Sequence, residues 1–271
     1  MKTKFQFTDL NAPRYVGIIL NKGEHFEIYK EAFAKASEKF GGDSLAYKTI
    51  TNGISEKNVT GSQFFWNTWL EQSGISLPGK VMLLKDWENA LSQDSGLVSG
   101  FYTDMPQLIL RSDEATFDKN QYLINDLSKK LKGEFEYSPE NPLIITGARL
   151  KSSKAKENEY GIDLDISNAE IKNDESFAPT NKIIKLGNIE KKLWTKKEGL
   201  SRLCLDENDV GSGSGNLADS DSDGRVALLD AIGVVEEKLA EYLIKLQEQK
   251  DLQISEIEKK YLEAKSILQN K

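Results

Sequence analysis

The 271-residue sequence contains one histidine, His25, and one cysteine, Cys204. A lone cysteine cannot form an internal disulfide, and one residue of each type is too few for a Cys- and His-based zinc site. A Ser-His-Asp or Cys-His catalytic arrangement would depend on His25, which precedes a helical pattern and has no supporting motif. We therefore expect a surface histidine, a packed cysteine and a protein that is not an enzyme.

The sequence also lacks a long apolar run and an excess of basic residues. No stretch of 18 apolar residues occurs, and the basic start of the chain is not followed by the apolar segment of a secretory signal. The formal charge of −7 disfavours nucleic-acid partners and membrane surfaces, and the cluster Lys191, Lys192, Lys196 and Lys197 is interpreted as solvated surface. We expect no nucleic acid, no membrane insertion and a cytoplasmic location by default, with surface display left open.

The first third of the chain has aromatic residues at helical spacing. Helices are predicted over residues 24–42, 62–74 and 83–93, the first ending at Gly41-Gly42 and the second capped by Ser62. Their aromatic stripes are interpreted as core. Residues 1–95 are therefore expected to form a helical or mixed N-terminal region.

Beyond residue 95 the pattern changes to short strands with one helix, predicted over 118–132 and capped by Asp118. The expected strands lie between turn clusters, at 106–112, 141–150, 160–168, 181–187, 191–196 and 200–205. This combination predicts an α+β protein.

Residues 206–226, DENDVGSGSGNLADSDSDGRV, consist mainly of Asp, Ser, Gly and Asn. The GSGSG stretch at 211–215 lacks the Lys-Ser/Thr of a P-loop. A flexible linker is disfavoured because apolar residues that resemble core anchors punctuate the polar ones, namely Leu203, Leu205, Val210, Leu217 and Val226. An anchored, irregular and exposed segment is typical of a binding surface on a scaffold.

Residues 193–226 are similar to the variable region of the target proteins of diversity-generating retroelements, in a subgroup with a GLSRL…LA.S…GRV frame. The similarity covers roughly residues 100–227 and includes TFDKNQYLINDL, SPENPLIITGARL, YGIDLDI and NDESFAP. In that family an error-prone reverse transcriptase replaces adenines in one segment of the target gene. Asn codons then become codons for Asp, Ser, Gly, Tyr and similar residues, which would explain the composition of 206–226.

The resemblance implies a C-type lectin-like fold, placed here at 96–230, in which a rigid backbone displays changeable side chains. It also implies non-enzymatic recognition of an unknown protein or other macromolecule, without a cofactor, through a hypervariable surface at about 204–223. The constant frame would comprise Leu200, Arg202, Leu203, Leu217, Ala218, Ser220, Gly224, Arg225 and Val226. The candidate diversified positions are Cys204, Asp206, Asn208, Gly211, Gly213, Ser214, Gly215, Asn216, Asp219, Asp221, Ser222 and Asp223.

This chain departs from the subgroup in two ways. It continues as GRVALL and then as a long helical pattern, and its variable segment contains almost no aromatic residue, although Tyr and Trp are the usual anchors of a recognition surface.

Calcium binding is the main alternative. Asp219, Asp221 and Asp223 fit positions 1, 3 and 5 of a calcium loop, with Gly224 at position 6 and Asp230 at position 12. Against it, the usual bidentate Glu is replaced by Asp, no clear helix enters the loop, and no second copy occurs.

The helical pattern begins at residue 228, and a long C-terminal helix is predicted over 231–271, with apolar residues that step by three and four. The interval between Leu246 and Ile257 resembles a coiled-coil stutter. The stripe would either cover the N-terminal aromatic faces or self-associate. We predict an oligomeric chain, so a structural protein assembled through this helix is a further alternative.

Overall fold

A computed structural model describes residues 16–20, 23, 25–179 and 182–230. The compact unit that contains them runs from Tyr15 to Asp230. The predicted C-terminal helix over 231–271 and its coiled-coil stripe lie outside the described residues, so that helix and the predicted oligomer stay predictions.

The described elements alternate between helices and short strands. In chain order they are β1 (Val16–Ile19), α1 (Phe26–Phe40), α2 (Leu45–Ile50), α3 (Phe64–Gln72), β2 (Lys80–Val81), α4 (Leu84–Gln93), β3 (Thr103–Leu110), η1 (Asp118–Asn120), α5 (Gln121–Leu131), β4 (Leu143–Thr146), β5 (Arg149–Ser152), β6 (Ile162–Asp165), β7 (Glu170–Asn173), η2 (Glu175–Phe177), β8 (Lys182–Leu186), β9 (Ile189–Thr195), β10 (Leu200–Leu205), β11 (Asp209–Ser212) and β12 (Ala227–Asp230).

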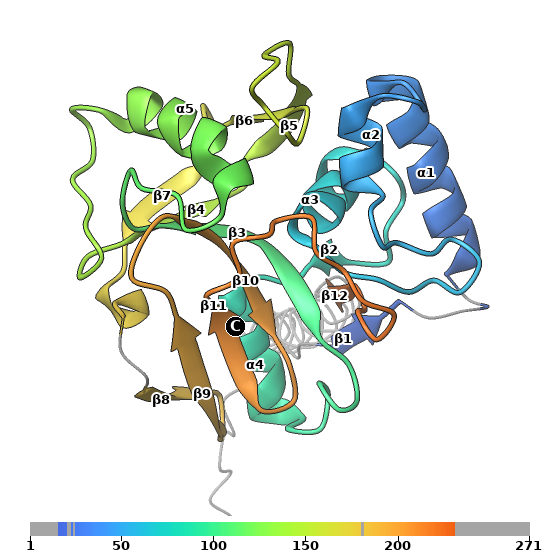
Figure 1. The fold of residues 1–271 in the computed structure, drawn as a ribbon. Helices are drawn as coiled ribbons and strands as arrows, with labels where there is room; N and C mark the ends of the chain where they lie inside the picture. The colour runs from blue at the N-terminus through green and yellow to red at the C-terminus, as the bar shows by residue number, and fades with distance from the viewer. Residues whose placement is uncertain (1–15, 21–22, 24, 180–181, 231–271) are drawn as a thin grey trace, which may run out of the picture. The chain divides into compact units, whose positions relative to one another are not determined.

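A curled seven-stranded sheet is the centre of the unit (Figure 1). Its strand order is β7-β4-β3-β10-β11-β9-β8, and β11 and β9 pair in parallel while its other neighbours are antiparallel. A three-stranded sheet, β1-β12-β2, joins the first and last strands of the unit, and β5 pairs with β6. The mixed composition confirms the predicted α+β class.

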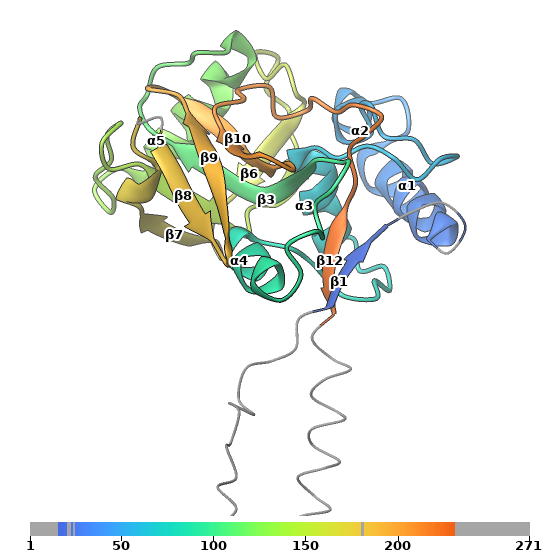
Figure 2. The same cartoon turned by 90° about the horizontal axis from the view of Figure 1, so that it is seen from below.

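Two hydrophobic clusters pack against the sheet strands. The larger includes Trp66 and Trp69 of α3 together with Leu108 of β3, and the smaller includes Trp87 of α4 together with Leu193 of β9. Figure 1 shows α4 behind β10 and β11, and Figure 2 shows the same helix from below. The interpretation of the aromatic stripes as core is confirmed.

The larger cluster draws residues from α1 and α3 as well as from β3, β10 and the segment before β12. Its members therefore come from both sides of residue 95. The domain boundary expected at that residue stays a prediction.

Three local expectations were wrong. Ser62 does not cap α3, because the Gln63 side chain accepts the hydrogen bond from the Phe65 amide and Ser62 instead accepts one from the Asp104 amide. Asp118 lies inside the short 3₁₀ turn η1 and makes no cap of α5. Residues 228–230 continue strand β12 rather than beginning a helix.

Candidate functional site

The predicted variable positions lie on the β10–β11 hairpin and on the connection from β11 to β12. The segment is less irregular than expected, because Asp209–Ser212 form a strand between β10 and β9. Exposed candidates are Asn208, Asp219, Asp221, Ser222 and Asp223; half-buried ones are Cys204, Asp206, Gly211, Gly213, Ser214 and Asn216; Gly215 is buried. The predicted anchors Leu203, Leu205, Val210, Leu217 and Val226 are all buried in the core, as expected.

The hairpin turn is held by a buried lysine that donates to main-chain atoms. Lys191 on β9 is 2% exposed, and its Nζ donates to the carbonyl oxygens of Asp206 at 2.8 Å and Glu207 at 2.6 Å. The Asp206 carboxylate accepts from the amides of Asn208 and Asp209, which closes the turn. The interpretation of Lys191 as solvated surface was wrong, because acidic neighbours in the sequence do not reveal which face of a strand a lysine occupies.

Side chains from outside the segment also hold the middle of the β11–β12 connection. Asn120 Nδ2 donates to the Gly215 carbonyl at 2.7 Å, and Asn52 Nδ2 donates to the Ala218 carbonyl at 2.6 Å. The Tyr160 hydroxyl accepts from the Leu217 amide and donates to Asn120 Oδ1. The backbone at Gly215, Leu217 and Ala218 is therefore fixed through main-chain carbonyl and amide groups. Every amino acid carries the carbonyl, and every one except proline carries the amide N–H.

The end of the connection is fixed around Tyr102. Its hydroxyl accepts from the Asp221 amide at 2.7 Å and donates to the Ser62 carbonyl, and its own carbonyl accepts from the Arg225 amide. A Cβ on Gly224 would come within 2.6 Å of the Ser62 amide nitrogen. This close approach explains why position 224 of the proposed constant frame is occupied by glycine.

A buried ion pair lies beneath the same connection. Arg202 donates to the Asp104 carboxylate at 2.7 Å and to the Asp219 carbonyl at 2.6 Å, and both members of the pair are almost fully buried. Burial raises the pKa of Asp104 to about 7, the Arg202 guanidinium opposes that shift, and the Asp219 carboxylate adds to it. Nearby, burial raises the pKa of the Cys204 thiol to about 12, so this thiol stays protonated at neutral pH.

The three candidate glycines differ in the space around them. A Cβ on Gly211 would lie 2.6 Å from Cys204 Sγ, and one on Gly215 would lie 2.8 Å from Phe117 Cβ. A Cβ on Gly213 meets nothing closer than Lys196 Cγ at 3.5 Å. Gly213 can therefore accept a side chain without movement, whereas Gly211 and Gly215 require a neighbour to shift.

The calcium alternative finds no geometric support in the described residues. No group of three or more acidic, His or Cys side chains is arranged to hold a metal ion within this part of the chain. Asp219 Oδ2 instead lies 3.5 Å from Arg202, and Asp230 belongs to β12, where it pairs with Val16.

Sequence reasoning overlooked an exposed aromatic residue beside the variable positions. Trp194 on β9 is 44% exposed, and the strand register places it next to Gly211. The Lys192 ammonium lies 3.5 Å from the centroid of its ring. The alternation in KKLWTK was the available signal, because it places Lys192 and Trp194 on the face opposite buried Leu193.

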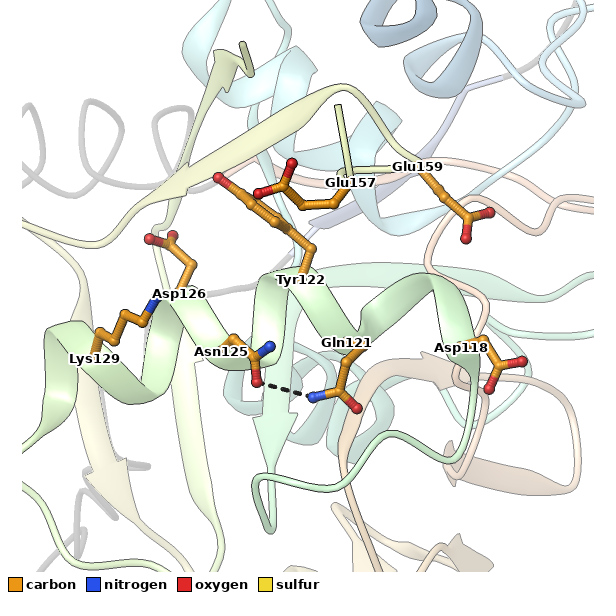
Figure 3. A pocket seen from close by; sticks show the side chains of 8 residues that line it. All are labelled: Asp118, Gln121, Tyr122, Asn125, Asp126, Lys129, Glu157 and Glu159. Atoms are coloured by element: carbon orange, nitrogen blue, oxygen red, sulfur yellow. Dashed lines mark hydrogen bonds between the residues drawn. The ribbon is translucent and has the colours of Figure 1, made fainter. Parts of the chain in front are cut away.

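Two hollows of the described surface lie away from the variable positions. One, of about 390 Å³, is lined by polar side chains, among which Gln121 donates to Asn125 (Figure 3). A larger hollow of about 790 Å³ contains Asp113, whose carboxylate accepts hydrogen bonds from Ser128 and Tyr137. Burial raises the pKa of Tyr137 to about 12, so its hydroxyl stays protonated at neutral pH.

No family model, curated protein or solved structure matches the chain. Within the described ranges, every helix is too short or too polar to cross a bilayer.

Proposed function

We propose that the protein recognises a protein or other macromolecular ligand, without catalysis, through side chains of residues 204–223 that retroelement mutagenesis diversifies. The observation that carries this proposal is that side chains from outside the segment fix its backbone by hydrogen bonds. Lys191, Asn120, Asn52, Arg202 and Tyr102 all bond to its main-chain atoms.

Anchors of this kind suit a surface whose side chains change. Carbonyl and amide groups remain when a codon changes, so these hydrogen bonds survive most substitutions at the positions they hold. A hydrogen bond to the side chain of a variable position would instead be lost when that residue changed, at a cost of about 1 kcal/mol of folding free energy. The exposed candidates Asn208, Ser222 and Asp223 can therefore vary at little cost to the fold.

The finer fold assignment, a C-type lectin-like display domain, belongs to the same proposal. It is supported by the pairing of β1 with β12, which fixes the end of the display segment against the start of the unit. It is further supported by the position of the variable candidates on connections anchored to a rigid sheet.

Replacing the exposed residues Asn208, Asp221, Ser222 and Asp223 together with Tyr tests the display surface. We expect the free energy of unfolding to change little, because exposed substitutions usually fall within about ±0.5 kcal/mol each. The contrasting variant is Asn120→Leu, outside the segment, which should cost about 1–3 kcal/mol because buried polar partners lose their bonds. Urea unfolding measures both, and a four-Tyr variant less stable than Asn120→Leu would contradict the proposal.

The origin of the variation has a separate test. The DNA next to the gene should encode a reverse transcriptase and a near-copy of codons 200–226 that differs mainly at adenines. Absence of both from the neighbouring DNA would count against retroelement mutagenesis, while leaving the recognition surface to be tested by binding.

A further inference from the structure

The sheet has an apolar and basic area on the face opposite α4. Ile183 on β8 is 68% exposed and Trp194 on β9 is 44% exposed, and these are two of the three large apolar side chains exposed in the described ranges. The neighbouring residues Leu186 and Leu193 point the other way, into the cluster that contains α4.

Positive charge predominates around the two apolar side chains. Lys192 lies opposite Ile183 and over the Trp194 ring, and Lys196 directly follows β9. Lys185 on β8 is the register partner of the exposed Glu190, the one acidic residue on this face of β9. None of these three lysines forms an ion pair with a described acidic residue. Their amino groups are therefore available to an incoming anion.

The area adjoins the variable segment directly. Gly211 is the register partner of Trp194, and Ser212 Oγ donates to the Trp194 carbonyl. A Cβ at Gly213 would lie 3.5 Å from Lys196 Cγ, and a Cβ at Gly215 would lie 3.5 Å from Lys196 Nζ. Side chains introduced at 211 or 213 would consequently project beside Trp194 and Lys196.

We propose that Trp194, with Lys192 and Lys196, forms a constant anchor that contacts an acidic protein segment, in which an apolar or aromatic side chain is flanked by carboxylates. This inference rests on the proposed function. The anchor would be the part of the recognition surface that does not vary, and side chains at the neighbouring variable positions would change the contacts at its border. Apolar contact with the indole and charge pairing with the lysines require both chemistries in the partner.

An extended polyanion fits this surface less well than a short acidic segment. Asp206, Asp209 and Asp219 lie along the adjoining hairpin and connection, and the whole chain carries a formal charge of −7. A nucleic acid long enough to cover the lysines would also meet these carboxylates, and its phosphates would be repelled.

Selection of random dodecapeptides on the full-length protein tests the proposal. Selected peptides should be enriched in Asp or Glu next to Trp, Phe or Leu. Trp194→Ala should lower their affinity by about tenfold or more, and Lys192→Glu by about fivefold. Lys172→Glu, an exposed lysine on β7 at the opposite edge of the sheet, is the matched control and should leave the affinity unchanged.

Tryptophan fluorescence provides a direct reading of contact. The other three tryptophans, Trp66, Trp69 and Trp87, are at most 2% exposed, so a blue shift on peptide binding would report Trp194. The shift should be absent in Trp194→Ala.

The outcomes separate this inference from the proposed function. Peptides whose affinity depends on Ser214→Tyr or Asp223→Tyr but not on Trp194→Ala would overturn the anchor and leave the display surface standing. Peptides that depend on Trp194 but on none of the variable positions would support the anchor and overturn diversified display. Selection of neutral or basic peptides, or failure to select any peptide that binds in the micromolar range, would overturn the acidic-segment proposal.

Discussion

At the scale of single residues, two neighbouring lysines on β9 have opposite environments. Lys191 is buried and bonds to two turn carbonyls, whereas Lys192 is exposed and lies over Trp194. Burial lowers the pKa of Lys191, and the acidic residues of the turn oppose that shift. Its burial is tolerated because the ammonium group donates hydrogen bonds to the two carbonyls, which would otherwise be buried without a donor.

Lys191→Met should destabilise the protein by about 1–3 kcal/mol, because the carbonyls of Asp206 and Glu207 lose their donor while the apolar stem is kept. Lys192→Met, the control, should change the stability by no more than about 0.5 kcal/mol. Urea unfolding at neutral pH measures both. Equal effects of the two substitutions would contradict the assigned role of Lys191.

Asp104 makes the stability depend on pH. Its pKa is raised to about 7 by burial, above the value of about 4 for an unfolded Asp. The folded state therefore binds the proton more tightly, and the stability contributed by this group is full below about pH 4 and is lost as pH rises through about 7. Asp219→Asn removes a neighbouring carboxylate, so we expect the pKa of Asp104 to fall.

Carbon NMR titration of the Asp104 carboxyl group measures that change. Asp223→Asn is the control, since Asp223 does not contribute to the Asp104 shift. An Asp104 pKa that is the same in Asp219→Asn and in the unaltered protein would argue against the coupling.

At the scale of elements, the β10–β11 hairpin couples two candidate variable positions. A Cβ on Gly211 would lie 2.6 Å from Cys204 Sγ, so Gly211→Ser alone should destabilise the protein by about 1–3 kcal/mol. Adding Cys204→Ala should recover part of that loss, a coupling of about 0.5–3 kcal/mol. Thermal unfolding of the single and double variants, with Gly213→Ser as the tolerated control, would show additive effects if the two positions were independent.

Elements with a strong hydrophobic period were predictable, and those fixed by distant partners were not. Helix α1 ends at Phe40 and is followed by Gly41, whose φ of 82° suits glycine, as the sequence indicated. Strand β11 was missed because Gly211 and Ser212 have low strand propensity, and its pairing with β9 and β10 creates the strand. Leu228 and Leu229 fit a helix or a strand equally well, and pairing with β1 and β2 decided the outcome.

Prediction of the site was limited in the same way, because the sequence does not show which distant residues become partners. The buried anchors Leu203, Leu217 and Val226 were recognisable because apolar residues stand out in a polar segment. The residues that hold the backbone were not, because Asn52 and Tyr102 are far from the segment in sequence and have no local motif. Trp194 was overlooked because the lysines around it suggested ordinary solvated surface.

At the scale of the whole unit, a shared core ties the N-terminal helices to the sheet. We expect a fragment of residues 96–230 not to fold, because Leu108, Leu110 and Leu217 would lose the aromatic side chains of α1 and α3 that share their cluster. Circular dichroism during urea titration should show a cooperative transition for the full chain and none for the fragment. A cooperative transition in the fragment would instead support an independent domain that begins at residue 96.

The main-chain bonds at Asp206, Gly215, Ala218 and Asp221 have a consequence for the thermodynamics of binding. A loop that becomes ordered on association loses backbone conformational entropy, at about 1–2 kcal/mol per residue. Here the backbone is ordered before any ligand arrives, so association would restrict mainly the displayed side chains. Different versions of the segment would then share a low backbone entropic cost, and their affinities would differ through the contacts and the ordering of the displayed side chains.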